Sequence, residues 1–202
     1  MRSAAITLTI ALALFAQPAL AGCKDTPAPG VNWSKCSKKL LMLPDSNLKK
    51  ANLQGVNLTS TGLARAKLDG ANLDGANLTL TSLKNASLAG ASLHKTYGMR
   101  TNFAGANLKG ANLSYVEFYR TNMADADLSD SNLTKSGFPR ADFTGANMSG
   151  ANLSKVDAIR CTFQDADLTN TDFTYAIVAR ASFAGAKLTG SNWTKTYLYR
   201  TW

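Results

Sequence analysis

A large apolar residue recurs at every fifth position of this chain from Leu43 to Leu198. Of the 32 positions in this register, 30 hold Leu, Phe, Met, Val or Trp, and only Gly98 and Ala158 do not. A helix needs apolar residues about every 3.6 residues and a half-buried strand every second residue, so a period of five predicts neither. Such a regular internal period predicts a solenoid, in which each repeat packs only against its neighbours along a rod.

The repeating unit has the form Ala-Asn-Leu-x-Gly, as at residues 71–75 and 106–110. A small residue almost always lies two positions before the large one. This unit resembles the pentapeptide-repeat family, and the resemblance covers residues 41–200. It implies an all-β fold, a right-handed quadrilateral β-helix in which each pentapeptide forms one side and four form a coil. The 32 units then predict about eight coils.

In such a rod the large residue points to the axis and stacks on the residue twenty positions away. The two irregular positions each lie one coil from a phenylalanine, Gly98 from Phe118 and Ala158 from Phe138, which indicates size compensation in a packed core. Asn or Asp often precedes the large residue, and we expect these side chains to form hydrogen-bonded ladders from coil to coil. One internal stack is expected to contain Phe143, Phe163 and Phe183.

The residues before the repeat divide into two segments. Arg2 is followed by an apolar run over residues 4–16 and then by Ala19-Leu20-Ala21. This pattern is typical of a secretory signal peptide, here residues 1–21, and the run is too short to span a bilayer. We therefore expect an exported protein, periplasmic or secreted. Residues 22–42 are expected to cap the first coil, with Trp33, Leu40 and Leu41 covering it, and residues 43–202 to form the β-helix.

The cysteines leave two interpretations open. Cys23 and Cys36 flank a Pro- and Gly-containing loop and could form a disulfide in an oxidising compartment. Alternatively, Leu20-Ala21-Gly22-Cys23 resembles a bacterial lipobox, in which Cys23 would carry a lipid and the protein would be a membrane-anchored lipoprotein. The third cysteine, Cys161, occupies a small inward position and is expected to be a buried hydrophobic residue.

A second period of twenty residues distinguishes one side of the rod. One corner column contains Arg100, Arg120, Arg140, Arg160, Arg180 and Arg200. The preceding corner contains Lys95, Tyr115, Lys135, Lys155, Tyr175 and Lys195. Between the corners lie residues that are atypical of the repeat, including Tyr97, Tyr119 and Tyr199.

Stacked arginines repel one another unless anions or carboxylates intervene, and Glu117 and Asp157 could neutralise part of the column. The guanidinium group suits phosphate, sulfate and carboxylate because its planar fork binds them with two hydrogen bonds. Aromatic neighbours could add cation–π contacts. We therefore hypothesise that the arginines, lysines and tyrosines of this side bind an extended anion. The alternative is a solvated ladder left by duplication of a twenty-residue unit.

Catalytic chemistry finds no support in the sequence. The single histidine, His94, lies at an outward position, and we find no nucleophile–base set, metal cluster or cofactor motif. The chain has a formal net charge of +9, whereas the pentapeptide proteins that protect gyrase are acidic. Nucleic acid is a less favoured partner than an anionic envelope polymer or lipid. The aromatic C-terminal end is expected to cap the core or to form a homodimer contact.

The sequence thus predicts an exported, non-catalytic binding or scaffold protein with a basic face. The alternative is a purely structural envelope protein, lipid-anchored or free, that has no specific ligand.

Overall fold

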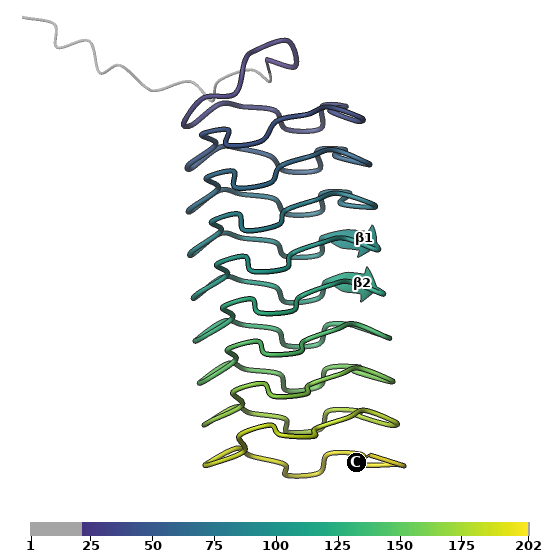
Figure 1. Cartoon of the computed structure of the whole chain (residues 1–202). Coiled ribbons are helices and arrows are strands. Elements are labelled where there is room, and N and C mark those ends of the chain that lie inside the picture. The colour runs from purple at the N-terminus through teal and green to yellow at the C-terminus, as the bar shows by residue number, and fades with distance from the viewer. Residues whose placement is uncertain (1–21, 202) are drawn as a thin grey trace, which may run out of the picture.

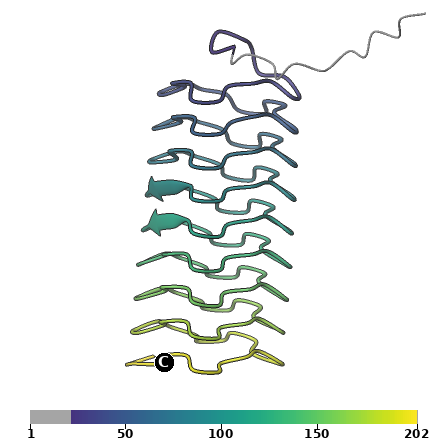
Figure 2. The ribbon, with the colours of Figure 1, turned by 180° about the vertical axis from the view of Figure 1, so that it is seen from behind.

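The computed structural model describes residues 22–201, which form one straight rod of stacked coils (Figures 1 and 2). Parallel bridges pair each outward residue with the residue twenty positions later, from Asn32–Asn52 to Ile177–Tyr197. Two such pairings are long enough to form strands, β1 (Tyr97–Met99) and β2 (Glu117–Tyr119). The strands are parallel, with Gly98 opposite Phe118. Within residues 22–201 there is no helix that could cross a membrane.

The backbone hydrogen bonds explain why a five-residue period closes into coils. The N–H of each inward residue donates to the next coil, as Leu73 N does to Ser92 O at 2.7 Å. The residue after the corner donates back within its own coil, as Ala76 N does to Leu73 O at 2.9 Å. At each corner the chain turns through a residue with a positive φ of about 60°. Coils of this kind satisfy their backbone groups mainly by stacking, so the rod stabilises itself along its length.

The core follows the predicted register. The large inward residues are fully buried along most of the rod. The predicted stack is confirmed: the ring of Phe163 lies parallel to those of Phe143 and Phe183, with centroids 5.0 and 4.9 Å away. Most inward threonines donate a hydrogen bond to a carbonyl oxygen of the preceding coil, as Thr101 Oγ1 does to Leu78 O at 2.8 Å, whereas buried Thr121 Oγ1 has no such partner. Packing of this density makes the core sensitive to single changes of volume.

The prediction that Asn and Asp would form ladders between coils is wrong for most of them. Their side-chain oxygens instead accept the backbone N–H two residues later, as Asn72 Oδ1 does from Asp74 N at 2.9 Å. Asn132 and Asn112 provide one of the few side-chain contacts between coils, at 3.4 Å. Asn and Asp therefore act as local turn caps, because their short side chains reach their own backbone more readily than the next coil.

The first coil begins ten residues earlier than the repeat suggested, because the bridge ladder already includes Asn32. Trp33 and Lys38 occupy inward positions of the same five-residue register. Trp33 is fully buried, and the Nζ atom of Lys38 lies 3.8 Å from its ring centroid. Burial lowers the pKa of Lys38, and the nearby carboxylate of Asp25 partly opposes this shift. The first layer is thus a cation stacked on an aromatic ring. The expectation that Leu40 and Leu41 also cover it is wrong: both are exposed, and Leu40 lies at a corner of the coil.

Cys23 and Cys36 form a disulfide in the structure, with their Cα atoms 5.4 Å apart. This separation lies within the range that a disulfide needs. The bond ties the segment before the first coil to the first coil itself. Cys161 is a free, buried cysteine, as expected. The predicted signal peptide, residues 1–21, lies outside the described residues.

The C-terminal end is open over residues 22–201, so the cap that we expected there is not formed by the described residues. Leu188 and Leu198 point inward in the last coil but are 41% and 53% exposed. Trp193 stacks on Phe173 with ring centroids 4.3 Å apart. Tyr197 and Tyr199 lie outside the core, because they hold outward positions of the repeat. A hollow of about 200 Å³ remains between the inward residues.

Candidate anion-binding face

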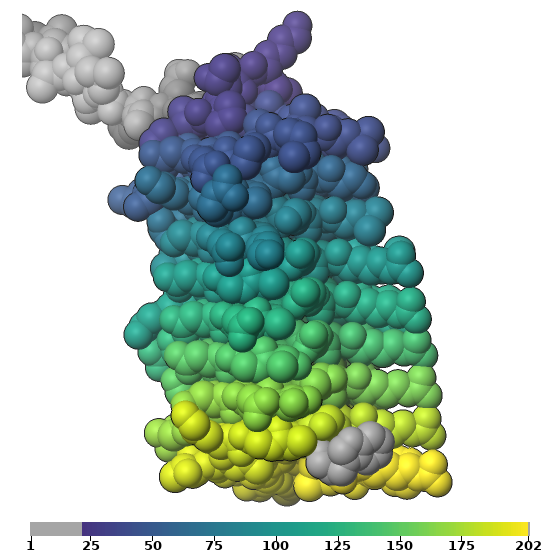
Figure 3. Space-filling model, in the orientation of Figure 1, coloured from purple at the N-terminus to yellow at the C-terminus, as the bar shows by residue number. Residues whose placement is uncertain are grey.

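The fold places the two predicted corner columns along the two edges of one side of the rod. We call this side the basic face; it consists of residues 95–100, 115–120, 135–140, 155–160, 175–180 and 195–200. In the view of Figure 3, long side chains project in a regular row at the corner that follows the strands, from the teal to the yellow coils. Successive coils lie about 4.8 Å apart, so the row from the first to the sixth arginine is about 24 Å long. Its arginines are Arg100, Arg120, Arg140, Arg160, Arg180 and Arg200.

Every residue of the two columns has a left-handed backbone. The φ angles are 54° at Arg100 and 62° at Arg140, and the lysine and tyrosine column has similar values. A residue with a Cβ atom in this conformation costs about 1–2 kcal/mol relative to the right-handed form. Glycine avoids this cost and occupies many other corners, such as Gly110. The basic face therefore keeps long side chains at positions where glycine would fold more readily.

The basic face also lacks most of the local turn caps. In the same coils the other sides mostly place Asn or Asp before the inward residue, whereas this side has Tyr97, Gly137 and Ile177 there. Asp157 is an exception, since its Oδ1 accepts the N–H of Ile159 at 3.1 Å. A lost side-chain-to-backbone hydrogen bond costs about 1 kcal/mol. This composition is not what stability of the repeat alone would favour.

The net positive charge of the described residues lies on this face. It carries ten Arg and Lys residues and two acidic residues, Glu117 and Asp157, while the rest of residues 22–201 carries eleven basic and eleven acidic residues. Four ion pairs occur among the described residues, and none of them includes a residue of the basic face. The expected neutralisation by Glu117 and Asp157 is therefore not formed as an ion pair.

Tyrosines separate some of the cations. The ring of Tyr119 has the guanidinium of Arg120 at 5.3 Å and that of Arg140 at 5.9 Å from its centroid. In the other column, Lys135 Nζ donates to the hydroxyl of Tyr115 at 2.7 Å. This hydrogen bond, together with the neighbouring lysines, lowers the pKa of Tyr115. Cation–π contacts at exposed sites stabilise by about 0.5–1 kcal/mol each, which offsets part of the repulsion.

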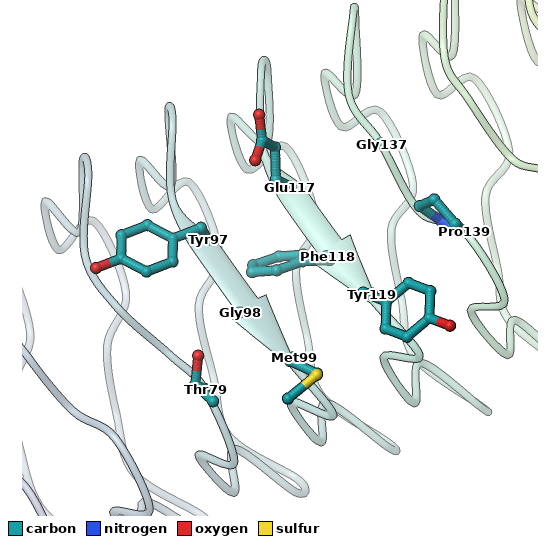
Figure 4. Close-up of a pocket in the computed structure, with 9 residues that line it drawn as sticks. All are labelled: Thr79, Tyr97, Gly98, Met99, Glu117, Phe118, Tyr119, Gly137 and Pro139. Carbon is teal, nitrogen blue, oxygen red and sulfur yellow. The ribbon is translucent and has the colours of Figure 1, made fainter.

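Two adjacent apolar hollows form the floor between the columns. The first has a volume of about 400 Å³ and lies over β1 and β2, where Tyr97, Met99 and Tyr119 surround it and buried Phe118 lies behind the strands (Figure 4). The second has a volume of about 310 Å³ and is lined by Ile159 and by three arginines of the column. Both include Tyr119 and Pro139. The hollows are continuous with the basic edge.

The structure brings all the predicted anion-binding residues to one side, where Tyr97, Tyr119 and Tyr199 are exposed between the columns. The apolar residues of the floor were not among the predicted binding residues. Met99, Pro139 and Ile159 each follow an inward residue, where the repeat usually has a polar one. That recurring departure from the repeat was the signal that could have revealed an apolar floor.

No group of three or more potential metal ligands lies within residues 22–201. His94 Nδ1 lies 2.9 Å from Ser114 Oγ, and its ring meets the edge of Tyr115. Burial raises the pKa of the Cys161 thiol to about 12, so it is not a reactive thiolate near neutral pH. The basic face presents cationic groups along its edges and apolar side chains between them.

Two family models match the chain. "Pentapeptide repeats (8 copies)" matches residues 63–97 and 101–138, and "Pentapeptide repeat region" matches residues 136–201. The chain belongs to the pentapeptide-repeat family. Its fold is the right-handed quadrilateral β-helix of these proteins. No curated protein matches the sequence of this pentapeptide-repeat protein.

Solved structures of other pentapeptide-repeat proteins are similar to this one. A trypsin-treated variant of QnrB1, a plasmid-mediated fluoroquinolone resistance protein, is 18% identical with a TM-score of 0.62, over 82% of this chain and 83% of that one. A second such variant is 15% identical with a TM-score of 0.63, over 81% and 82% of the two chains. HetL, from the cyanobacterium Nostoc sp. strain PCC 7120, is 26% identical over 84% and 87%, with a TM-score of 0.34. At these identities the likeness to the QnrB1 structures concerns the fold alone.

Proposed function

We propose that this protein is an exported, non-catalytic binding or scaffold protein whose basic face holds an extended anionic partner. The observation that carries the proposal is the position of the charge. All of the net positive charge of residues 22–201 is on one side, in two columns that no ion pair neutralises. Arginine at regular spacing suits a partner with repeated phosphate, sulfate or carboxylate groups.

Two structural costs support this proposal over a solvated ladder. The columns keep residues with a Cβ atom at left-handed corners, and the side between them lacks most turn caps. Adjacent like charges add repulsion. The adjacent column has Gly105, Gly145 and Gly185 in alternation with Asp125 and Asp165, whereas the two columns of the basic face contain no glycine from residue 95 to residue 200. Selection for a ligand explains why the more costly residues are present.

The proposal is tested by binding to a labelled sulfated polysaccharide, heparin, as a probe. The variant Arg120→Glu/Arg140→Glu/Arg160→Glu should weaken binding by about tenfold or more and reduce the dependence of affinity on salt. These side chains point outward, so the variant should fold. The matched control is Lys67→Glu/Lys84→Glu/Lys109→Glu, which changes the net charge equally on other sides and should have a small effect. Equal losses in both variants would show that only net charge matters and would overturn the proposal.

Export is a separate part of the proposal. Its support is the pattern of residues 1–21 and the Cys23–Cys36 disulfide, since such bonds persist in oxidising compartments. Mass spectrometry of the protein from its native cells should give a chain that begins after Ala21, two mass units lighter than the reduced form. An uncleaved chain would contradict export. An acylated Cys23 would instead establish the lipoprotein alternative.

A further inference from the structure

The basic face contains more apolar surface than binding to a hydrophilic polyanion would use. Met99, Ile177 and Tyr197 are each more than two-fifths exposed, and they lie in the two neighbouring rows of residues between the columns. The two hollows add a concave apolar surface that runs from Tyr97 to Ala179. A wholly hydrophilic polyanion would leave the apolar floor exposed to water. Exposed apolar patches with a polar rim mark a surface that contacts a partner with apolar groups.

The backbone of this side cannot pair with an extended peptide strand, because its hydrogen bonds run between coils. Phe118 N donates to Gly137 O, and Gly137 N donates to Val116 O, each at 2.8 Å. The ladder continues in the same way through Asp157 and Ile177. Addition of a peptide strand needs a free sheet edge, and along this side the hydrogen bonds run between coils. A partner must therefore be recognised through side chains, by charge at the edges and by apolar contact in the middle.

Anionic lipid has this combination of groups. Basic residues near a membrane surface are attracted to acidic headgroups, and tyrosine favours the boundary between headgroups and acyl chains. The aliphatic stems of Arg and Lys can lie along apolar surface while their charged ends reach outward. The two charged edges of the face run parallel, and tyrosines occur in both the floor and one edge. The same division into an apolar centre and a cationic border occurs in amphipathic helices that lie on membranes.

We propose that the basic face lies flat on an anionic lipid leaflet. The two columns contact lipid phosphates, and the floor around Met99, Tyr119 and Ile177 enters the region where headgroups meet acyl chains. The rod axis then lies parallel to the membrane plane. This inference rests on the proposed function, because it identifies the anionic partner of the same face.

The test compares vesicles with a soluble polyanion. Wild-type protein should co-sediment with phosphatidylcholine vesicles that contain about 30% phosphatidylglycerol and much less with pure phosphatidylcholine. At about 0.5 M salt, heparin binding should be lost, whereas part of the vesicle binding should remain because apolar contacts are not screened. Complete loss of vesicle binding at that salt would overturn the inference.

The floor is tested with Met99→Ser/Ile177→Ser. This variant should bind the anionic vesicles about tenfold more weakly, because it loses apolar contact area, and bind heparin within about twofold of wild type. The control, Leu40→Ser/Met42→Ser, removes two exposed apolar residues at the N-terminal end of the rod and should change neither. Thermal unfolding of both variants checks that the rod is intact.

The outcomes separate the two proposals. If the floor variant binds vesicles as wild type does while the arginine reversals weaken both vesicle and heparin binding, the face holds a soluble polyanion and the lipid inference is wrong. If the arginine reversals leave both kinds of binding unchanged, the proposed function itself fails.

Discussion

Phe118 occupies the space that the missing side chain of Gly98 leaves in the core. A Cβ atom on Gly98 would lie 3.3 Å from Phe118 Cε1 and 3.2 Å from the carbonyl carbon of Leu78, and it would collide with Thr101 Oγ1. Phe118 is fully buried and directly follows Gly98 in the stack. Gly98, which is small for an inward position, and the large Phe118 beside it therefore form one packing unit.

We expect Gly98→Ala to destabilise the protein by about 1–3 kcal/mol, because a well-packed core must shift to admit a methyl group. Adding Phe118→Leu should recover part of this loss by making room. Denaturant unfolding of both single variants and the double variant measures the coupling, which should be about 0.5–3 kcal/mol. Strictly additive effects would show that the two residues do not share this space.

Replacing an arginine of the basic face with glycine should stabilise the rod. Arg160 has a φ of 60°, and glycine at such a position relieves about 1–2 kcal/mol of strain while costing about 0.5–1 kcal/mol of backbone entropy. Loss of one charge from the column also reduces repulsion. We expect Arg160→Gly to raise the free energy of unfolding by up to about 1 kcal/mol and to weaken heparin binding. The measurements are denaturant unfolding and a binding titration.

The converse substitution gives the control. Gly110 has a φ of 62°, and no heavy atom lies within 4 Å of a Cβ added there. Gly110→Ala should therefore destabilise by about 1 kcal/mol through strain alone, without altering heparin binding. A neutral result at Gly110 together with a destabilising Arg160→Gly would mean that the corner does not strain residues with a Cβ atom.

The stability of the protein should fall with rising pH above about 9 through Cys161. Its pKa is about 12 in the folded state, against an ordinary value of 9.0. Between these values the unfolded chain loses the thiol proton and the folded chain keeps it, so unfolding becomes more favourable by up to about 1.4 kcal/mol per pH unit. Cys161→Ser preserves a donor to Phe138 O, which lies 2.9 Å from the thiol sulfur, and does not titrate. From pH 8 to pH 10 the unfolding free energy of wild type should therefore fall relative to that of the serine variant. A constant difference would mean that the thiol is not buried.

The open C-terminal end leads to a prediction about the oligomer. The N–H groups of Leu188 and Trp193 have no following coil to bond within residues 22–201, and the apolar side chains beside them are partly exposed. Two copies stacked end to end about a two-fold axis would cover these N–H groups and these apolar side chains, because a two-fold contact buries the same surface on each copy. Light scattering should give twice the chain mass for wild type and the single mass for Leu198→Glu. Leu40→Glu, at the other end, should leave the mass unchanged. A monomeric wild type would contradict the dimer.

Much of the fold could be predicted from the sequence because one residue in five decides it. Once Leu53 and Phe163 share a register, the twenty-residue coil and the internal stacks follow. The start of the first coil was harder to predict, since Trp33 and Lys38 hold inward positions but belong to no Ala-Asn-Leu unit. A lysine in the core register is not a pattern that hydrophobic periodicity can detect.

The columns of the basic face could also be predicted, because a period of twenty places Arg100 above Arg120. The hollows could not, since they depend on the shape of the surface between Tyr119 and Pro139. Nor could the role of Asn72, because hydrogen bonding to its own backbone or to the next coil uses the same residue type.

The strict twenty-residue repeat makes the length of the basic face adjustable without redesign. Deleting residues 121–140 would join Arg120 to Ala141 and leave every column in line, with Phe143 above Phe103 in place of Met123. One arginine, one lysine and one layer of floor would disappear together. A family of such rods, shortened or lengthened one coil at a time, would act as a molecular ruler, and the affinity of each member would count how many ligand groups a single coil engages.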